Sequence, residues 1–209
     1  MKIGLMLSAA ALVVAAVAVA AMPVQDAKAK AKADDKAMDQ MGAAMEAWAK
    51  AGKLGPPHEA FAKQVGTWDQ TVKMWMPGMP PTENKSTATR ELILGGRFLV
   101  EKVKGDMGPL GPFEGHGILG YNNLTKQYDH VWLDSMGTGM MISHGTAAPD
   151  GTITMTGQYD DAMTGGVTKT RTVSKMVSDN EQKFEMYETK GSAPEAKTME
   201  ITYTRAGGH

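Results

Sequence analysis

From Gly66 onward the sequence is a series of short segments of alternating polarity separated by turn residues, and this pattern limits the possible folds more than any other feature. The separators are rich in Gly, Pro, Asn and Asp, as at residues 77–81, 95–96, 149–151 and 179–180. No helical periodicity intervenes, so an antiparallel meander is expected. We expect ten strands, near residues 67–76, 83–93, 97–104, 113–121, 127–134, 139–146, 151–157, 167–176, 182–189 and 197–205.

An open meander of this length would expose unpaired strand edges, and closure into a barrel removes them. Within residues 167–176, Lys169 and Arg171 share one face, while Thr168, Thr170 and Thr172 share the other. The basic face must contact water, so the threonine face is expected to point inward. A barrel of about ten strands is wide enough to enclose a cavity. The sequence therefore predicts an all-β fold, an antiparallel barrel over residues 66–206 with a partly polar interior.

The first 21 residues are typical of a secretory signal peptide. Lys2 is followed by an uncharged apolar run over residues 3–21, and Ala18-Val19-Ala20 forms a small-residue cleavage site. The alternative is an uncleaved membrane anchor, because this run is just long enough to span a bilayer. The weak hydrophobicity of alanine favours cleavage. We therefore expect a periplasmic or secreted protein without stable membrane insertion.

The segment between the signal peptide and the barrel divides into two parts. Residues 22–37 are charged and low in complexity, which indicates a flexible spacer or the frayed start of a helix. Residues 38–65 are expected to be helical, because Met38, Met41, Met45 and Trp48 recur at helical spacing. Gly52 and the prolines that follow end this N-terminal helix, and a second helical turn leads to the first strand.

Composition excludes several classes of function. The chain has no cysteine, which excludes disulfide bonds and thiol catalysis. Its formal net charge of −1 argues against nucleic acid as a partner, because no basic excess is present to neutralise phosphates. Of the 18 methionines, the 16 that follow residue 21 are expected to fill the core, where branched side chains are scarce.

Gly66-Thr67-Trp68, at the start of the first predicted strand, resembles the G-x-W motif of the calycin barrels, which include the lipocalins. In that group the tryptophan closes one end of the barrel and a basic residue of the last strand stacks across it. The resemblance implies these structural roles for Trp68 and Arg205. A guanidinium over an indole face is a favourable cation–π contact.

A wider set of motifs is similar to the bacterial domain-of-unknown-function 1579 family over about residues 55–206. In chain order the motifs are His58 with Gly66-Thr67-Trp68, Gly95-Gly96-Arg97-Phe98-Leu99, Gly117-Ile118-Leu119-Gly120-Tyr121, Trp132-Leu133-Asp134-Ser135 and Tyr203-Thr204-Arg205. The resemblance implies a calycin-like barrel and no particular chemistry. The chain lacks the helical lid of fatty-acid-binding proteins and the glycine signature of nitrobindin-like haem barrels. No cofactor is therefore expected.

The densest group of functional side chains lies in residues 113–146. Tyr128, His130, Trp132 and Asp134 alternate along one predicted strand and share a face, and His116 lies on the preceding strand. If this face is internal, it supplies an aromatic wall with polar groups, which suits a small-molecule site. Alternatively, Trp132 and His130 are ordinary core residues, because Val131 and Leu133 on the other face are also apolar. We expect these five residues to line a site for a small apolar or amphipathic molecule.

Two alternative functions remain open. The methionines at 74, 76, 79, 136, 140 and 141, or His116, His130 and His144 together, could bind a metal, since thioethers favour Cu(I). A hydrolase or isomerase could use Asp134 and His130, although no nucleophile elbow precedes Ser135. We assign no catalytic residue and no metal ligand from the sequence, and we favour a protein that is not an enzyme.

Overall fold

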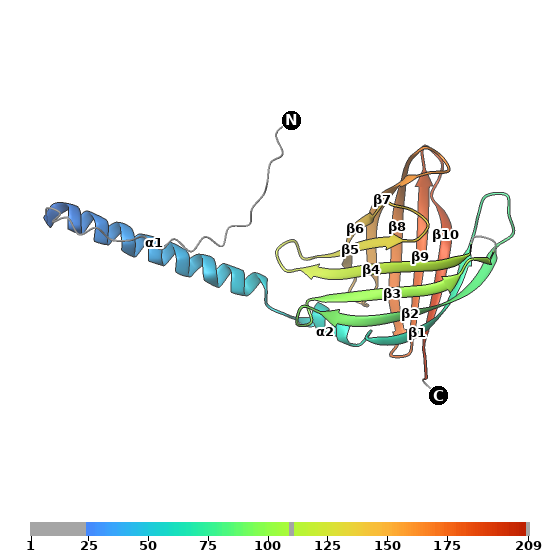
Figure 1. The fold of residues 1–209 in the computed structure, drawn as a ribbon, viewed down its shortest axis with the longest axis horizontal. Coiled ribbons are helices and arrows are strands. Elements are labelled where there is room, and N and C mark those ends of the chain that lie inside the picture. The colour runs from blue at the N-terminus through green and yellow to red at the C-terminus, as the bar shows by residue number, and fades with distance from the viewer. Residues whose placement is uncertain (1–23, 109–110, 208–209) are drawn as a thin grey trace. The chain divides into compact units, whose positions relative to one another are not determined.

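The computed structural model describes residues 24–108 and 111–207, so the predicted signal peptide of residues 1–21 lies outside the described residues. Contacts divide the chain into two units, one ending at Trp48 and the other running from Ala49. Helix α1 spans Val24–Ala51 and is drawn as one continuous helix in Figure 1. It includes residues 24–37, for which a flexible spacer was one of two interpretations. Alanine and lysine in this stretch are strong helix formers, which accounts for the difference.

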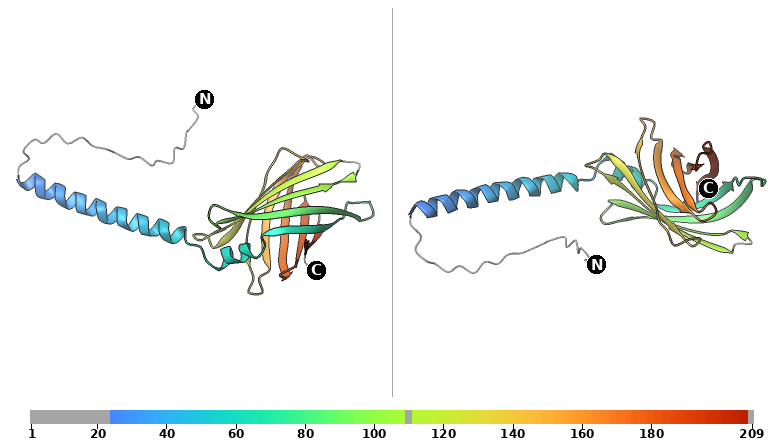
Figure 2. Two further views of the ribbon diagram at one scale, coloured as in Figure 1. Left: turned by 60° about the horizontal axis from the view of Figure 1, so that its bottom comes forward. Right: turned by 90° about the horizontal axis from the view of Figure 1, so that it is seen from above.

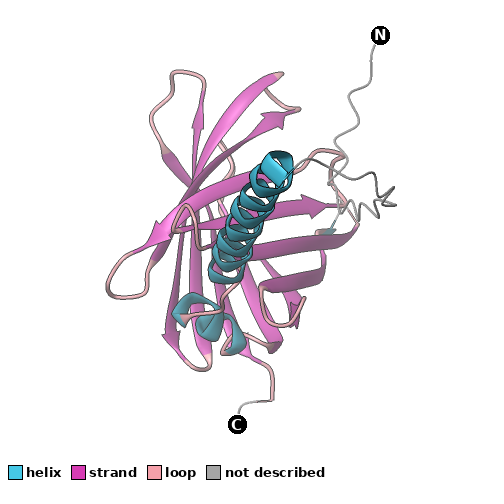
Figure 3. Cartoon of the chain, turned by 90° about the vertical axis from the view of Figure 1, so that its left-hand side faces the viewer, coloured by secondary structure: helices cyan, strands magenta, loops and turns pink. Residues whose placement is uncertain are grey.

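Neither helix of the described residues contains a stretch long and apolar enough to cross a membrane. The second helix, α2 (Pro56–Ala62), is short and begins with two prolines. The backbone N–H of Gly55 donates to Nδ1 of His58 at 3.2 Å, which satisfies a donor at the start of α2. Phe61 of α2 is buried, and the helix contacts β3 and β4 at one end of the barrel (Figure 3).

Ten antiparallel strands form a closed barrel, as expected from the sequence. Each strand pairs with its neighbours in the chain, and β1 pairs with β10 to complete the ring. Figures 1 and 2 show β2–β4 crossing β8–β10 at a steep angle. The strands are β1 (Gly66–Met74), β2 (Thr82–Ile93), β3 (Phe98–Asp106), β4 (Pro112–Asn122), β5 (Gln127–Asp134), β6 (Met141–Ala147), β7 (Ile153–Asp161), β8 (Gly166–Ser178), β9 (Glu181–Lys190) and β10 (Ala196–Arg205).

The threonine face of β8 points into the barrel, as predicted from the basic residues on its other face. Thr168, Thr170 and Thr172 are each at most 4% exposed. The hydrophobic core consists of two clusters. One contains Phe61, Leu99, Tyr128 and Met155, and the other contains Trp68, Ala88, Val103 and Tyr203.

The expectation that methionines fill the core is wrong for most of those described. Met155 is buried, and Met176 packs beside the second cluster. In contrast, Met79, Met136 and Met140 are each more than half exposed. They lie in the β1–β2 and β5–β6 connections, where no layer of the protein can cover them.

Trp68 lies where the first and last strands meet. It is fully buried, and its Nε1 donates to the carbonyl oxygen of Gln64 at 2.9 Å. Arg205 is its direct partner across the β1–β10 ladder, with the guanidinium carbon 4.2 Å from the ring centroid. The same guanidinium donates to the carbonyl oxygens of Lys63, Val65 and Asp179. Arg205 therefore joins three chain segments over the indole ring.

We predict that Trp68→Ala lowers the free energy of unfolding by about 3–5 kcal/mol, as large core truncations do. The substitution removes the buried ring and the surface on which Arg205 stacks. Urea unfolding followed by circular dichroism measures the change. Thr67→Ala, at an exposed position beside it, is the matched control. A loss below about 1 kcal/mol for Trp68→Ala would contradict the closing role.

Candidate ligand-binding site in the barrel interior

Strand β5 directs four of the five predicted site residues into the barrel. Tyr128 belongs to the buried cluster with Phe61, and Trp132 packs against the cluster that contains Trp68. His130 and Asp134 alternate with them and share their face. His116 is not part of this group. It is exposed on β4, on the opposite face from Gly115 and Gly117.

Two glycines of β4 allow Trp132 and His130 to lie flat against the barrel wall. A Cβ at position 115 would lie 2.5 Å from Cζ2 of Trp132. A Cβ at position 117 would lie 3.0 Å from Nε2 of His130 and 3.4 Å from the indole ring. Side chains at these positions would push the rings toward the barrel axis. Gly115 and Gly117 were not among the predicted site residues, although their alternation opposite aromatic residues was a usable signal.

The indole of Trp132 is also held by hydrogen bonds. Its Nε1 donates to Oδ2 of Asp134 at 2.8 Å, and Oδ1 of Asp134 accepts from the backbone N–H of Met136 at 2.9 Å. The His130 ring stacks at 30° to the indole, with 6.5 Å between the centroids. Burial lowers the pKa of His130, against the opposing effect of the Glu101 carboxylate. The imidazole is therefore neutral at pH 7, and this wall presents an aromatic surface with few free donors.

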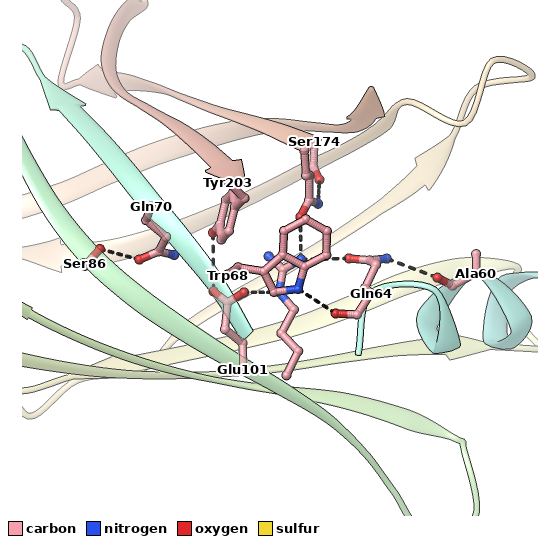
Figure 4. A network of polar contacts seen from close by, with 10 residues as sticks. Ala60, Gln64, Trp68, Gln70, Ser86, Glu101, Ser174 and Tyr203 are labelled. Atoms are coloured by element: carbon pink, nitrogen blue, oxygen red, sulfur yellow. Dashed lines mark hydrogen bonds and ion pairs between the residues drawn. The ribbon is translucent and has the colours of Figure 1, made fainter. Parts of the chain in front are cut away.

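A polar network lies near Trp68 and includes Gln64, Glu101 and Tyr203 (Figure 4). These three residues all contact Arg90. Arg90 forms an ion pair with Glu101, and the two side chains are 5% and 15% exposed. Its Nη1 donates to Oε1 of Gln64 at 3.3 Å and to Oε1 of Gln182 at 2.5 Å. Its guanidinium also lies 4.4 Å from the centroid of the Tyr203 ring. Every polar partner of Arg90 here is within the protein.

The Tyr203 hydroxyl lies close to this network and donates to Oε1 of Glu101 at 3.4 Å. Burial raises the pKa of Tyr203 above its ordinary value, and the negative charge of Glu101 raises it further. The sequence prediction did not include this network. The sequence feature that could have indicated this network is Arg90. It alternates with the exposed Thr89 and Glu91 and so shares the inward face of Ala88.

On β1, β5 and β10, burial of the inward side chains decreases from Trp68, Tyr128 and Tyr203 toward the end away from α2. On β1, Trp68 and Gln70 are buried, whereas Val72 is partly exposed. On β10, Tyr203 is buried and Ile201 is partly exposed. The inward-facing Trp132 is partly exposed as well. The inward side chains of these three strands are therefore more exposed at the end that carries the β1–β2 and β5–β6 connections, which we call the open end.

A second polar group lies on the inward faces of β7, β8 and β9 near the open end. The Tyr159 hydroxyl donates to Oε1 of Glu188 at 3.0 Å, and Oγ1 of Thr168 donates to Oδ2 of Asp161 at 2.9 Å. Lys190 lies 3.1 Å from Asp161 and 3.6 Å from Glu188. Hydrogen bonds lower the pKa of Asp161 to about 2, and the bond from the Met163 backbone N–H has the largest effect. Asp161 is therefore ionised at neutral pH.

The histidines proposed as joint metal ligands do not converge. His130 faces the interior, whereas His116 and His144 are exposed on the outer face. Nδ1 of His144 lies 2.7 Å from Oδ1 of Asp129. Within residues 24–108 and 111–207 no three His, Cys, Asp or Glu side chains form a group that could hold a metal ion.

The hydrolase hypothesis required Asp134 and His130 to act together. Both oxygens of Asp134 accept hydrogen bonds from Trp132 and Met136, so this carboxylate positions the indole. The Ser135 hydroxyl accepts from the backbone N–H of Glu114 at 3.1 Å. Among the described side chains, none forms a hydrogen bond with the His130 ring.

A groove of about 530 Å³ lies on the outer face of β6–β9, away from these inward residues. Most of the residues that line it have polar side chains, including Lys169 and Arg171. Glu195 pairs with Arg171 at 2.6 Å and covers part of it. The sequence did not indicate this groove, because it depends on how the β9–β10 connection folds over the sheet.

Comparison with known proteins is consistent with this fold. The sequence model of a family described as protein of unknown function (DUF1579) matches residues 53–205. No curated protein matches the chain. Among solved structures, the S-type phycobiliprotein lyase CPES from Guillardia theta is similar, with 12% identity and a TM-score of 0.55 over 74% of this chain and 95% of that one. Rv2717c from M. tuberculosis is also similar, with 15% identity and a TM-score of 0.50 over 73% and 99%.

We predict that Gly115→Ala displaces the Trp132 ring and lowers the free energy of unfolding by about 1–3 kcal/mol, the usual cost of overpacking. Gly139→Ala is the matched control, because nothing lies within 4 Å of a Cβ at that position. Urea unfolding measures both. Equal stability of the two variants would show that the contact between Gly115 and Trp132 does not constrain the wall.

We predict that His130 makes stability fall on acidification. Its folded-state pKa is lowered, so below the ordinary value of about 6.5 the unfolded chain binds a proton that the folded chain does not. Stability is therefore complete above that value and is lost as the pH falls through it. His130→Gln should lose less stability than the parent between pH 7.5 and pH 5.5, measured by urea unfolding. His116→Gln is the comparison at an exposed position, and an unchanged loss in His130→Gln would refute the assignment.

Proposed function

The chain belongs to the family described as protein of unknown function (DUF1579), and we propose that it binds a small apolar or amphipathic molecule inside its barrel, against Trp132. The observation that carries the proposal is the wall formed by Trp132 and His130 over Gly115 and Gly117. The glycines keep both rings off the barrel axis, and the inward face remains partly exposed. An aromatic surface with a few fixed polar groups is the usual composition of a small-molecule site.

The arrangement of buried and open ends supports the same proposal. At the α2 end, Trp68, Phe61 and the Arg90 network are buried and hydrogen-bonded within the protein. At the open end, the inward side chains of β1 and β10 are partly exposed. A molecule entering there would exchange water for contact with Trp132 and the apolar residues near it, which is favourable.

The similar solved structures include a phycobiliprotein lyase, and at 12% identity this likeness concerns the fold alone. Fold does not determine function, so the proposal rests on the residues of this barrel. We also propose that the protein is exported, with residues 1–21 removed as a signal peptide. The basic start, apolar run and small-residue site of the sequence support this.

Native mass spectrometry of the protein purified from its own host tests both proposals. We expect a mass that corresponds to cleavage near Ala20 or Ala21, and a bound molecule that dissociates on activation. Trp132→Ala should reduce ligand occupancy by about tenfold, because it removes the largest contact surface in the wall. Leu133→Ala, on the outer face of the same strand, is the matched control and should retain the ligand.

Protein that is ligand-free in every preparation would contradict the binding proposal. Loss of ligand from Leu133→Ala to the same extent as from Trp132→Ala would place the site elsewhere. An intact mass that includes residues 1–21 would refute export with cleavage, independently of ligand binding.

A further inference from the structure

We infer that the barrel interior selects its ligand by charge, preferring an apolar molecule with a cationic group and rejecting the corresponding carboxylate. The inference rests on the proposed function and specifies the class of ligand for the same site. It is drawn from the ionisable side chains that the ten strands direct inward.

The inward-facing positions carry more negative than positive charge. Four carboxylates point inward against three cationic side chains, which leaves one net negative charge among the described strands. The carboxylates are Glu101, Asp134, Asp161 and Glu188, and the cations are Arg90, Lys190 and Arg205. His130, the other ionisable group on the β5 wall, is neutral because burial disfavours its charged form.

Arg90 and Lys190 are already paired with carboxylates of the protein. Arg90 forms the ion pair with Glu101 and donates to Gln64 and Gln182. Lys190 lies between Asp161 and Glu188. A ligand carboxylate would have to displace one of these partners and leave it unpaired, which is costly away from water.

Arg205, the third cation, is engaged as well. It lies over Trp68 at the buried end, and each of its three guanidinium nitrogens donates to a backbone carbonyl oxygen. Every inward-facing cation of the described strands therefore already has a protein partner.

A cationic group on the ligand would instead meet carboxylates whose negative charge is not fully balanced. Asp134 accepts from two neutral N–H groups and has no basic partner, so its negative charge is uncompensated. Asp161 and Glu188, 5% and 8% exposed, share the single charge of Lys190. The aromatic faces of Trp132 and Tyr159 lie among these carboxylates and can contact a cation directly. Charge interactions here are stronger than in bulk water, because much of the site is shielded from solvent.

Competition among three ligands of equal chain length tests the inference. N-phenyl-1-naphthylamine, an uncharged fluorescent probe, is bound first and then displaced at pH 7.5 by decylammonium, decanol or decanoate. We expect decylammonium to displace it best and decanoate worst, with an affinity ratio of about tenfold or more between them. Glu188→Gln and Asp134→Asn should each reduce this ratio. Glu114→Gln, on the outer face of β4, is the matched control and should leave it unchanged.

The outcomes separate this inference from the proposed function. Displacement by decanoate as strong as that by decylammonium would overturn the charge preference while leaving ligand binding intact. A ratio unchanged in both Glu188→Gln and Asp134→Asn would overturn its assignment to these carboxylates. Failure of the parent protein to bind the probe or any of the three ligands would contradict the proposed function, and the charge preference with it.

Discussion

The pairing of β1 with β10 is the interaction on which the rest of this structure depends. It turns a ten-stranded meander into a ring, so no strand edge of the barrel remains without a partner strand. The same ladder places Arg205 opposite Trp68, which is fully buried near the end of the barrel that α2 contacts. The aromatic wall on β5 and the polar group on β7–β9 face the same interior because the sheet is a closed ring.

The interior of this barrel is held together by charge and hydrogen bonding as much as by apolar packing. Removing Arg90 and Glu101 from water is costly, and their mutual attraction offsets that cost only when their remaining donors and acceptors are also satisfied. Gln64, Gln182 and Tyr203 supply those partners from α2–β1, β9 and β10. The network therefore joins strands that are distant around the ring. It also explains how a chain with few branched apolar residues maintains a stable closed end.

The strands and the closed fold were predictable from the sequence because turn residues mark the ends of each strand and alternation marks its faces. The inward direction of Trp132 was not predictable, since Val131 and Leu133 are apolar too and the register of β5 against its neighbours decides the matter. His116 was grouped with Trp132 by proximity in sequence. It lies between Gly115 and Gly117 on β4 and therefore faces outward, whereas the two glycines face inward. The buried roles of Arg90 and Glu101 were missed because charged residues are expected outside unless their partners are known. Those partners come from other strands and become visible only in three dimensions.

The closure of the ring has a consequence for the order in which the fold can form during synthesis. Strand β1 leaves the ribosome long before β10, so for most of translation β2 is its only possible partner. Arg205, which stacks on Trp68, is at the end of β10. Asp179, whose carbonyl oxygen accepts a hydrogen bond from Arg205, is in the β8–β9 turn. Contacts between residues so far apart in the chain slow folding, because a large loop must close before they can form. The ring therefore cannot close, and Arg205 cannot stack on Trp68, until the last strand has been made.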